Sequence, residues 1–163
     1  MKEPISEKLA MEAMKYLKPR DRTRAEVWSF LQKYAQSHSE AEETMIWLEN
    51  RGYVNDLRYA DYYIRGAMEK GFSQNRIRKK LLEKGIEEGT IQKAFSAYGE
   101  EREVDLSQLE AEEALAEANR LMKKEGYSRK TLRKIASRLA YLGYEETLIY
   151  ELLENLENSQ TLF

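Results

Sequence analysis

The sequence predicts an all-α protein in which three tandem three-helix repeats form an elongated, curved array. Only two prolines and eight glycines occur in 163 residues, so the chain lacks the frequent turn residues that sandwiches and barrels need. A glycine followed by a large apolar residue recurs five times, and this pair is a typical helix-stop signal. Related helix patterns recur with a period of about 50 residues, which is typical of stacked helical repeats.

The first repeat is expected at residues 1–54. Ser6 is a suitable N-cap, because its side-chain oxygen can accept a backbone N–H of the first helical turn. Thr23 and Glu26 have the spacing of a capping box before a second helix, and residues 39–42 have it before a third. Gly52 is expected to end that third helix.

The second repeat is expected at residues 55–99. Asn55 or Asp56 opens its first helix, and Ser73 caps its second helix. The expected helices and stop glycines are 56–70 with Gly71, 74–84 with Gly85, and 88–98.

The third repeat, preceded by an acidic linker, is expected at residues 100–163. The acidic stretch 100–117 is interpreted as a linker in its first part and as the start of a long helix in its second part. That helix is expected to end at Gly126, and Ser128 caps the next helix, which ends at Gly143. The equivalent patterns of the three repeats are Thr23, Val27 and Leu31; Ser73, Ile77 and Leu81; and Ser128, Leu132 and Ala136.

An ordered set of short motifs lies between about residues 50 and 95. It comprises Gly52-Tyr53-Val54-Asn55-Asp56-x-Arg58-Tyr59-Ala60, Gly71-x-Ser73, Ile77-Arg78, Leu81 and Lys84-Gly85-Ile86. This set resembles the central repeat of the RecX family, whose members are bacterial modulators of the RecA recombinase. The family usually has Asp-Asp where this chain has Asn55-Asp56, and either residue can cap a helix.

The resemblance implies a regulator that binds RecA filaments and inhibits their ATPase, strand-exchange and co-protease activities in DNA repair and the SOS response. It implies contact with DNA through the filament and no chemistry by this chain. It also implies the repeat architecture, with a structural signature at Gly52, Asp56, Arg58, Tyr59, Gly71 and Gly85.

The composition argues against an enzyme, a membrane protein and a dedicated DNA binder. The net charge is −2 with a pI near 5.7, whereas proteins that rely on phosphate neutralisation are usually basic. There is no cysteine, and no apolar run approaches the roughly 20 residues of a bilayer span, so a cytoplasmic monomer without metal or cofactor is expected. The single histidine, His38, is expected in an exposed loop.

Two basic runs occupy equivalent helices of the second and third repeats. At about 100° per residue, the cations of the run in the third repeat lie on one half of their helix, and the other half is apolar. An ordinary solvated surface is the alternative to a binding face. We predict that the filament contacts are made by Arg76, Arg78, Lys79, Lys80, Lys84, Arg129, Lys130, Arg133, Lys134 and Arg138.

Two other functions stay open. The acidic pI also suits a helical-repeat adaptor that binds a protein and never meets nucleic acid. A helix-turn-helix reader at 56–84, with Gln74, Asn75 and Arg76 facing bases, fits three near-equivalent repeats less well. Among the tyrosines, Tyr59, Tyr63, Tyr127 and Tyr144 are expected in the core, and Tyr62 and Tyr141 are not assigned.

Overall fold

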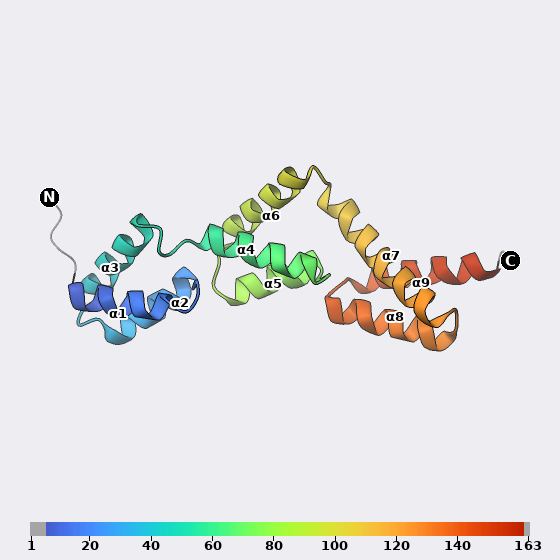
Figure 1. The fold of residues 1–163 in the computed structure, drawn as a ribbon, viewed down its shortest axis with the longest axis horizontal. Helices are drawn as coiled ribbons and strands as arrows, with labels where there is room; N and C mark the ends of the chain where they lie inside the picture. Colours follow the sequence, from blue (N-terminus) through green and yellow to red (C-terminus); the bar gives the residue numbers. More distant parts are fainter. Residues whose placement is uncertain (1–5, 162–163) are drawn as a thin grey trace. The chain divides into compact units, whose positions relative to one another are not determined.

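The computed structural model describes residues 6–161, and within this range it contains nine α-helices and no strand (Figure 1). This confirms the all-α class and the array of three-helix repeats, whereas the elongated, curved form of the array stays a prediction. The helices are α1 Glu7–Leu17, α2 Arg24–Tyr34, α3 His38–Asn50, α4 Asp56–Glu69, α5 Gln74–Glu83, α6 Glu88–Arg102, α7 Leu106–Glu125, α8 Arg129–Leu142 and α9 Glu146–Thr161.

The contacts divide the chain into two compact units. The first unit runs through Tyr63 and includes Lys80–Phe95, and the second comprises Ile64–Lys79 and the chain from Ser96 onward. Residues of α4 and α5 therefore belong to both units. The expected repeat boundaries at 54/55 and 99/100 are retained as a proposal about how the sequence is organised.

The core of the first unit lies between α1, α2 and α3, each of which buries an apolar stripe. Leucine side chains that are fully removed from water contribute about 1.5–3 kcal/mol each, so this small core is a substantial source of stability. Its buried residues are Leu9, Ala13, Val27, Leu31, Ala41, Met45, Leu48 and Val54.

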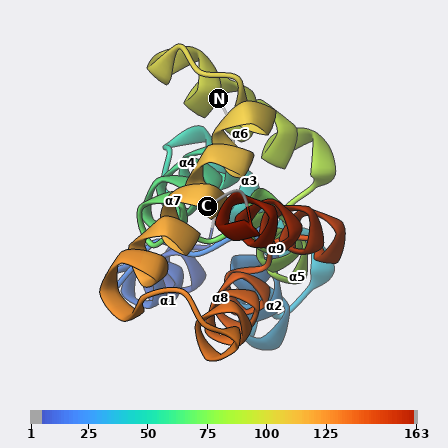
Figure 2. The same cartoon turned by 90° about the vertical axis from the view of Figure 1, so that its right-hand side faces the viewer.

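The core of the second unit lies around α8, which packs against both α7 and α9 (Figures 1 and 2). The small side chains of Ala114 and Ala118 on α7 face the apolar side of α8 and allow the helices to approach closely. The buried residues are Ala114, Ala118, Ile135, Leu139, Leu142, Tyr144, Ile149 and Leu152.

Most expected helix starts are confirmed, but the start of α3 is not. Its N-cap is Ser37, whose Oγ accepts the N–H of Glu40 at 3.1 Å, so the capping box expected at residues 39–42 is wrong. The Glu40 carboxylate instead accepts the N–H of Gln36 at 2.8 Å. His38 is exposed as expected, but it is the first residue of α3 rather than part of a loop, and its Nε2 lies 2.8 Å from Glu42.

All five expected stop glycines have positive φ, and four of them close a helix with the paired backbone bonds of a Schellman motif. Gly126 differs, because its ψ of 168° is not left-handed helical and its N–H makes a single bond to Met122 O. Tyr127 is 46% exposed, and its expected place in the core is wrong. The acidic linker is also shorter than expected, since α6 continues to Arg102 and α7 begins at Leu106.

Within the first unit, the start of α2 is held by residues from the second repeat. The Thr23 hydroxyl donates to the carbonyl of Lys84 at 3.1 Å, and the N–H of Arg24 donates to Asp56 Oδ1 at 2.7 Å. The backbone at Gly85 passes so close that a Cβ there would lie 2.5 Å from the Cβ of Ala25. We call this set of contacts a joint.

The second unit contains an equivalent joint at the start of α5. The Ser73 hydroxyl donates to the carbonyl of Gly143 at 2.6 Å, and the N–H of Gln74 donates to Glu110 Oε1 at 3.2 Å. A Cβ at Gly143 would lie 2.5 Å from the Cβ of Arg76. Each joint therefore combines a capping hydroxyl, a carboxylate from the next repeat and a glycine without room for a side chain.

The Asp56 hydrogen bond can be tested by substitution. We expect Asp56→Ala to lower the free energy of unfolding by about 1 kcal/mol, as for the loss of a helix cap, and Asp56→Asn to cost less than about half as much. Both variants remove the charge, but only alanine removes the oxygen that accepts the Arg24 N–H. Urea unfolding measures both losses, and equal losses would contradict this role of the side chain.

The same carboxyl group should make stability depend on pH. Burial raises the pKa of Asp56, with smaller contributions from the charges of Glu49 and Glu87, although the hydrogen bond and charge of Arg24 oppose the shift. Stabilisation from this protonated group is complete below the unfolded pKa of about 3.9 and is lost as pH rises through the folded value. The stability of wild type relative to Asp56→Asn should therefore fall as the pH rises from the unfolded pKa of this carboxyl group through its raised pKa in the folded protein.

Candidate functional site

The exposed side of α8 carries the basic residues that the sequence placed there. Leu132, Ile135 and Leu139 are buried on the opposite side, as the helical spacing predicts. The five cations are exposed, and we call them the α8 basic face: Arg129, Lys130, Arg133, Lys134 and Arg138.

Two acidic residues of α7 neutralise part of this face. Glu125 accepts a hydrogen bond from Lys134 at 2.7 Å, and that bond, with the charges of Lys134, Lys124 and Lys130, lowers the pKa of Glu125. Glu117 lies 3.2 Å from Arg138 and also pairs with Arg120, and these hydrogen bonds lower its pKa. The sequence did not reveal these pairs, because the partners are far apart along the chain.

The basic residues of α5 differ in their exposure and in the groups that they contact. Arg76 is half-buried in the joint of the second unit, where its guanidinium stacks 4.4 Å from the ring of Phe72 and donates to the carbonyl of Tyr141. Lys80 pairs with Glu83 at 3.4 Å, and Arg78 is half-buried. Lys79 is exposed. Contact of these residues with a filament stays a prediction.

Tyr141 connects the two basic runs within the second unit. It is largely exposed, and it lies between the guanidinium of Arg76, 5.0 Å from the ring centroid, and that of Arg138 at 5.6 Å. Tyr144 is buried as expected, and its hydroxyl donates to the carbonyl of Gly71 at 3.2 Å.

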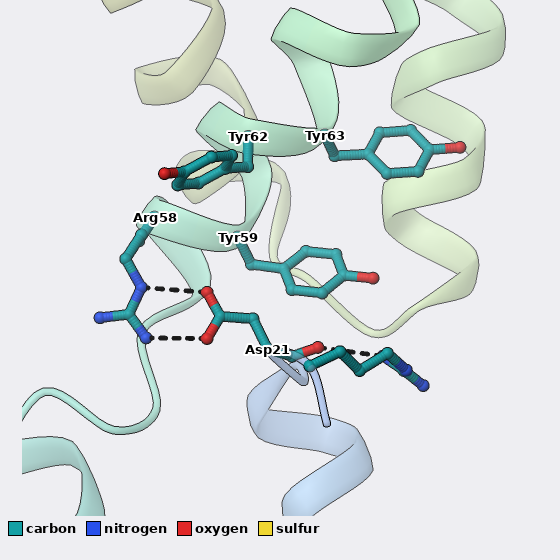
Figure 3. Close-up of a pocket in the computed structure, with 6 residues that line it drawn as sticks. Asp21, Arg58, Tyr59, Tyr62 and Tyr63 are labelled. Atoms are coloured by element: carbon teal, nitrogen blue, oxygen red, sulfur yellow. Dashed lines mark hydrogen bonds and ion pairs between the residues drawn. The ribbon is translucent and has the colours of Figure 1, made fainter. Parts of the chain in front are cut away.

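Asp56 and Gly85 of the structural signature form part of the joint of the first unit, whereas Gly71 lies in the second unit. Arg58 donates to the carbonyl of Gly52 at 2.6 Å and reaches Asp21 through two nitrogens at 3.2 and 3.4 Å (Figure 3). Arg58 thus links the second repeat to the first through Gly52 and Asp21. Asn55 caps α4 through the N–H of Arg58 at 3.0 Å, which leaves Asp56 available to cap α2.

Beside this ion pair lies a hollow of about 530 Å³ that the sequence did not reveal (Figure 3). Tyr59 and Tyr63 form part of its wall and are half-buried, and Lys84 Nζ lies 5.9 Å from the Tyr59 ring centroid. Tyr62 also lines it but is 72% exposed. The available signal was that Tyr62 lies two positions from both Ala60 and Ile64, so it falls outside the buried stripe that these residues form at helical spacing.

The described part of the chain contains no group of three His, Cys, Asp or Glu side chains arranged to hold a metal ion. None of the helices within residues 6–161 is both long enough and apolar enough to cross a bilayer. Four carboxylates with shifted pKa values, those of Asp56, Glu110, Glu117 and Glu125, belong to the joints or to ion pairs. Burial, with a smaller contribution from the charge of Glu110, raises the pKa of Glu113. These features define the class of the molecule as a tandem helical-repeat protein that carries an exposed basic face on α8.

Comparisons with known proteins show which proteins the chain resembles. The model of the second three-helix domain of RecX matches residues 55–94. The regulatory protein RecX of Staphylococcus carnosus is 31% identical over 147 residues, which are 89% of this chain and 52% of that relative. The RecX protein of Clostridium acetobutylicum is 27% identical over 88% of this chain and 66% of its own length. Residues 55–94 therefore form a RecX second three-helix domain, and the chain as a whole is similar to RecX regulatory proteins.

Solved structures share the fold. The crystal structure of RecX from Lactobacillus salivarius aligns with a TM-score of 0.70 at 24% identity, covering 92% of this chain and 95% of that one. A second crystal structure, of a regulatory protein RecX, aligns with a TM-score of 0.65 at 22% identity over 91% of this chain and 70% of the other. The chain spans between 37% and 52% of the length of three curated RecX relatives that it matches.

Proposed function

We propose that this protein binds nucleoprotein filaments of the RecA recombinase and inhibits their ATPase, strand-exchange and co-protease activities. It acts in DNA repair and the SOS response as a cytoplasmic monomer. The α8 basic face carries the proposal, because Arg129 and Arg133 are exposed and form no ion pair with the described residues. The RecX domain at residues 55–94 and the similarity of the chain to RecX regulatory proteins support the choice of partner.

A filament offers both acidic protein surface and DNA phosphate, which suits an acidic chain with one basic face. The net charge of −2 gives no general attraction to DNA, so affinity depends on local cations. The protein regulates by binding one state of the filament more tightly than others, and it shifts the filament toward that state. This mechanism requires no reaction by the chain itself.

Co-sedimentation with RecA tests the proposal. We expect the protein to pellet with RecA assembled on single-stranded DNA with a slowly hydrolysed nucleotide, and to inhibit DNA-dependent ATP hydrolysis at the same concentrations. In the absence of DNA, little of the protein should pellet with RecA. Equal binding to RecA with and without DNA would favour the adaptor that needs no nucleic acid, and no binding to either would contradict the proposal.

A further inference from the structure

Two hollows on the first unit form one groove that the proposed function does not use. The first, beside Tyr62, has a volume of about 530 Å³, and the second, beside Lys18 and Tyr53, has about 430 Å³. Asp21 and Arg58 line both hollows, so their ion pair forms the divide between two halves of the same groove.

The groove is lined by four cations and one anion. The anion, Asp21, is paired with Arg58, which leaves Lys15, Lys18 and Arg20 to give the groove its positive charge. Lys15 reaches Glu12 at 3.4 Å and Arg20 reaches Glu26 at 3.4 Å, both with at least half of the cationic side chain exposed. Such exposed pairs contribute little energy, so a phosphate group competes with them readily.

Each half of the groove also presents an exposed aromatic ring. Tyr62 is 72% exposed in one half and Tyr53 is 41% exposed in the other. Tyr53 is supported from behind, since its ring lies 5.9 Å from that of Trp47, which in turn stacks on the guanidinium of Arg51 at 4.7 Å. Tyr62 lies on the same side of the hollow as Arg58 (Figure 3).

We propose that this groove binds single-stranded nucleic acid, with Tyr53 and Tyr62 stacking on bases and with Lys15, Lys18 and Arg20 holding phosphates. Aromatic platforms beside a line of cations are the usual means of binding unpaired strands, whereas a duplex keeps its base faces stacked inside. An apolar helix of a partner protein would leave the cations unpaired, and an acidic peptide would make no use of the two rings.

Fluorescence anisotropy of a labelled oligothymidylate, with the protein alone and at low salt, tests the groove. We expect Tyr62→Ala to weaken binding about tenfold, because stacking on an aromatic ring is a main source of affinity for an unpaired base. Tyr62→Phe keeps the ring and should stay within about twofold of wild type. Lys18→Glu should weaken binding and reduce the salt slope by about 0.7, the value for one single-strand phosphate contact.

Matched controls lie elsewhere on the chain. Tyr150 on α9 is 63% exposed and Lys8 on α1 is exposed, so Tyr150→Ala and Lys8→Glu change similar side chains outside the groove and should bind as wild type does. An equal loss in Tyr62→Ala and Tyr150→Ala would overturn the proposal. Displacement of the oligonucleotide by equal concentrations of duplex or polyglutamate, or no binding by wild type, would also overturn it.

The assay contains no recombinase, so its outcome is independent of filament binding. If the wild-type protein binds the oligonucleotide but does not inhibit the RecA ATPase, the result counts against the proposed function alone. If the wild-type protein inhibits the RecA ATPase but does not bind the oligonucleotide, the result counts against the groove alone.

Discussion

Gly85→Ala is expected to lower the free energy of unfolding by roughly 3 kcal/mol. Two costs add at this position. The φ of +84° is left-handed, a conformation that costs an L-residue with a Cβ about 1–2 kcal/mol. The new Cβ would also lie 2.5 Å from the Cβ of Ala25 in the joint, and overpacking of this kind costs about 1–3 kcal/mol.

Gly52→Ala is the matched control for this experiment. Gly52 has a similar φ of +76° and closes a helix in the same way, but a Cβ there would meet nothing within 4 Å. We therefore expect Gly52→Ala to lower the free energy of unfolding only by the conformational cost of about 1–2 kcal/mol. Urea unfolding monitored by circular dichroism compares the two variants, and equal losses would show that the joint does not restrict Gly85.

The sequence predicted the helix ends well because their chemistry is local. A glycine with an apolar neighbour, or a serine three residues before an orphan N–H, acts within a single turn of backbone. Gly71, Gly85 and Gly143 were recognisable for that reason, and so were the caps at Thr23 and Ser73. Even so, the same local reasoning selected residues 39–42 rather than Ser37 as the start of α3, since several serines and glutamates there satisfy the pattern.

The joints were not predictable, because they depend on residues from different repeats. Asn55 and Asp56 are interchangeable as candidate caps in the sequence, yet only Asn55 caps its own helix, while Asp56 caps a helix that begins 32 positions earlier. Glu110 has the equivalent function toward Gln74, although it lies inside α7 rather than at its first residue. Each of these carboxylates accepts a backbone N–H at the start of a helix in the preceding repeat, and only the three-dimensional structure shows this common role.

The α8 basic face shows the same limit. The helical period correctly separates its cations from the buried leucines. It does not show that Glu125 and Glu117 on α7 already pair with Lys134 and Arg138, which leaves the N-terminal part of α8 as the more available region of positive charge. Arg129 and Arg133 are therefore the most informative residues to change.

Reversing both charges, in Arg129→Glu with Arg133→Glu, is expected to raise the concentration needed for half-maximal inhibition of the RecA ATPase at least about tenfold. This corresponds to about 1.4 kcal/mol of binding free energy. Where the lost contacts are to single-strand phosphates, the dependence of log affinity on log salt should also fall by about 0.7 for each contact. Stability should change by no more than about 0.5 kcal/mol, because both side chains are exposed.

The control is Lys8→Glu with Lys33→Glu, which changes the net charge by the same amount at two exposed cations of the first repeat. If net charge alone governs binding, both double variants will lose inhibition equally. If the α8 basic face binds the filament, only the α8 variant will lose it. Lys134 is unsuitable for the reversal, because a glutamate there would face Glu125 and disturb the contact between α7 and α8. Wild-type inhibition by a folded Arg129→Glu, Arg133→Glu variant would place the binding surface elsewhere on the chain.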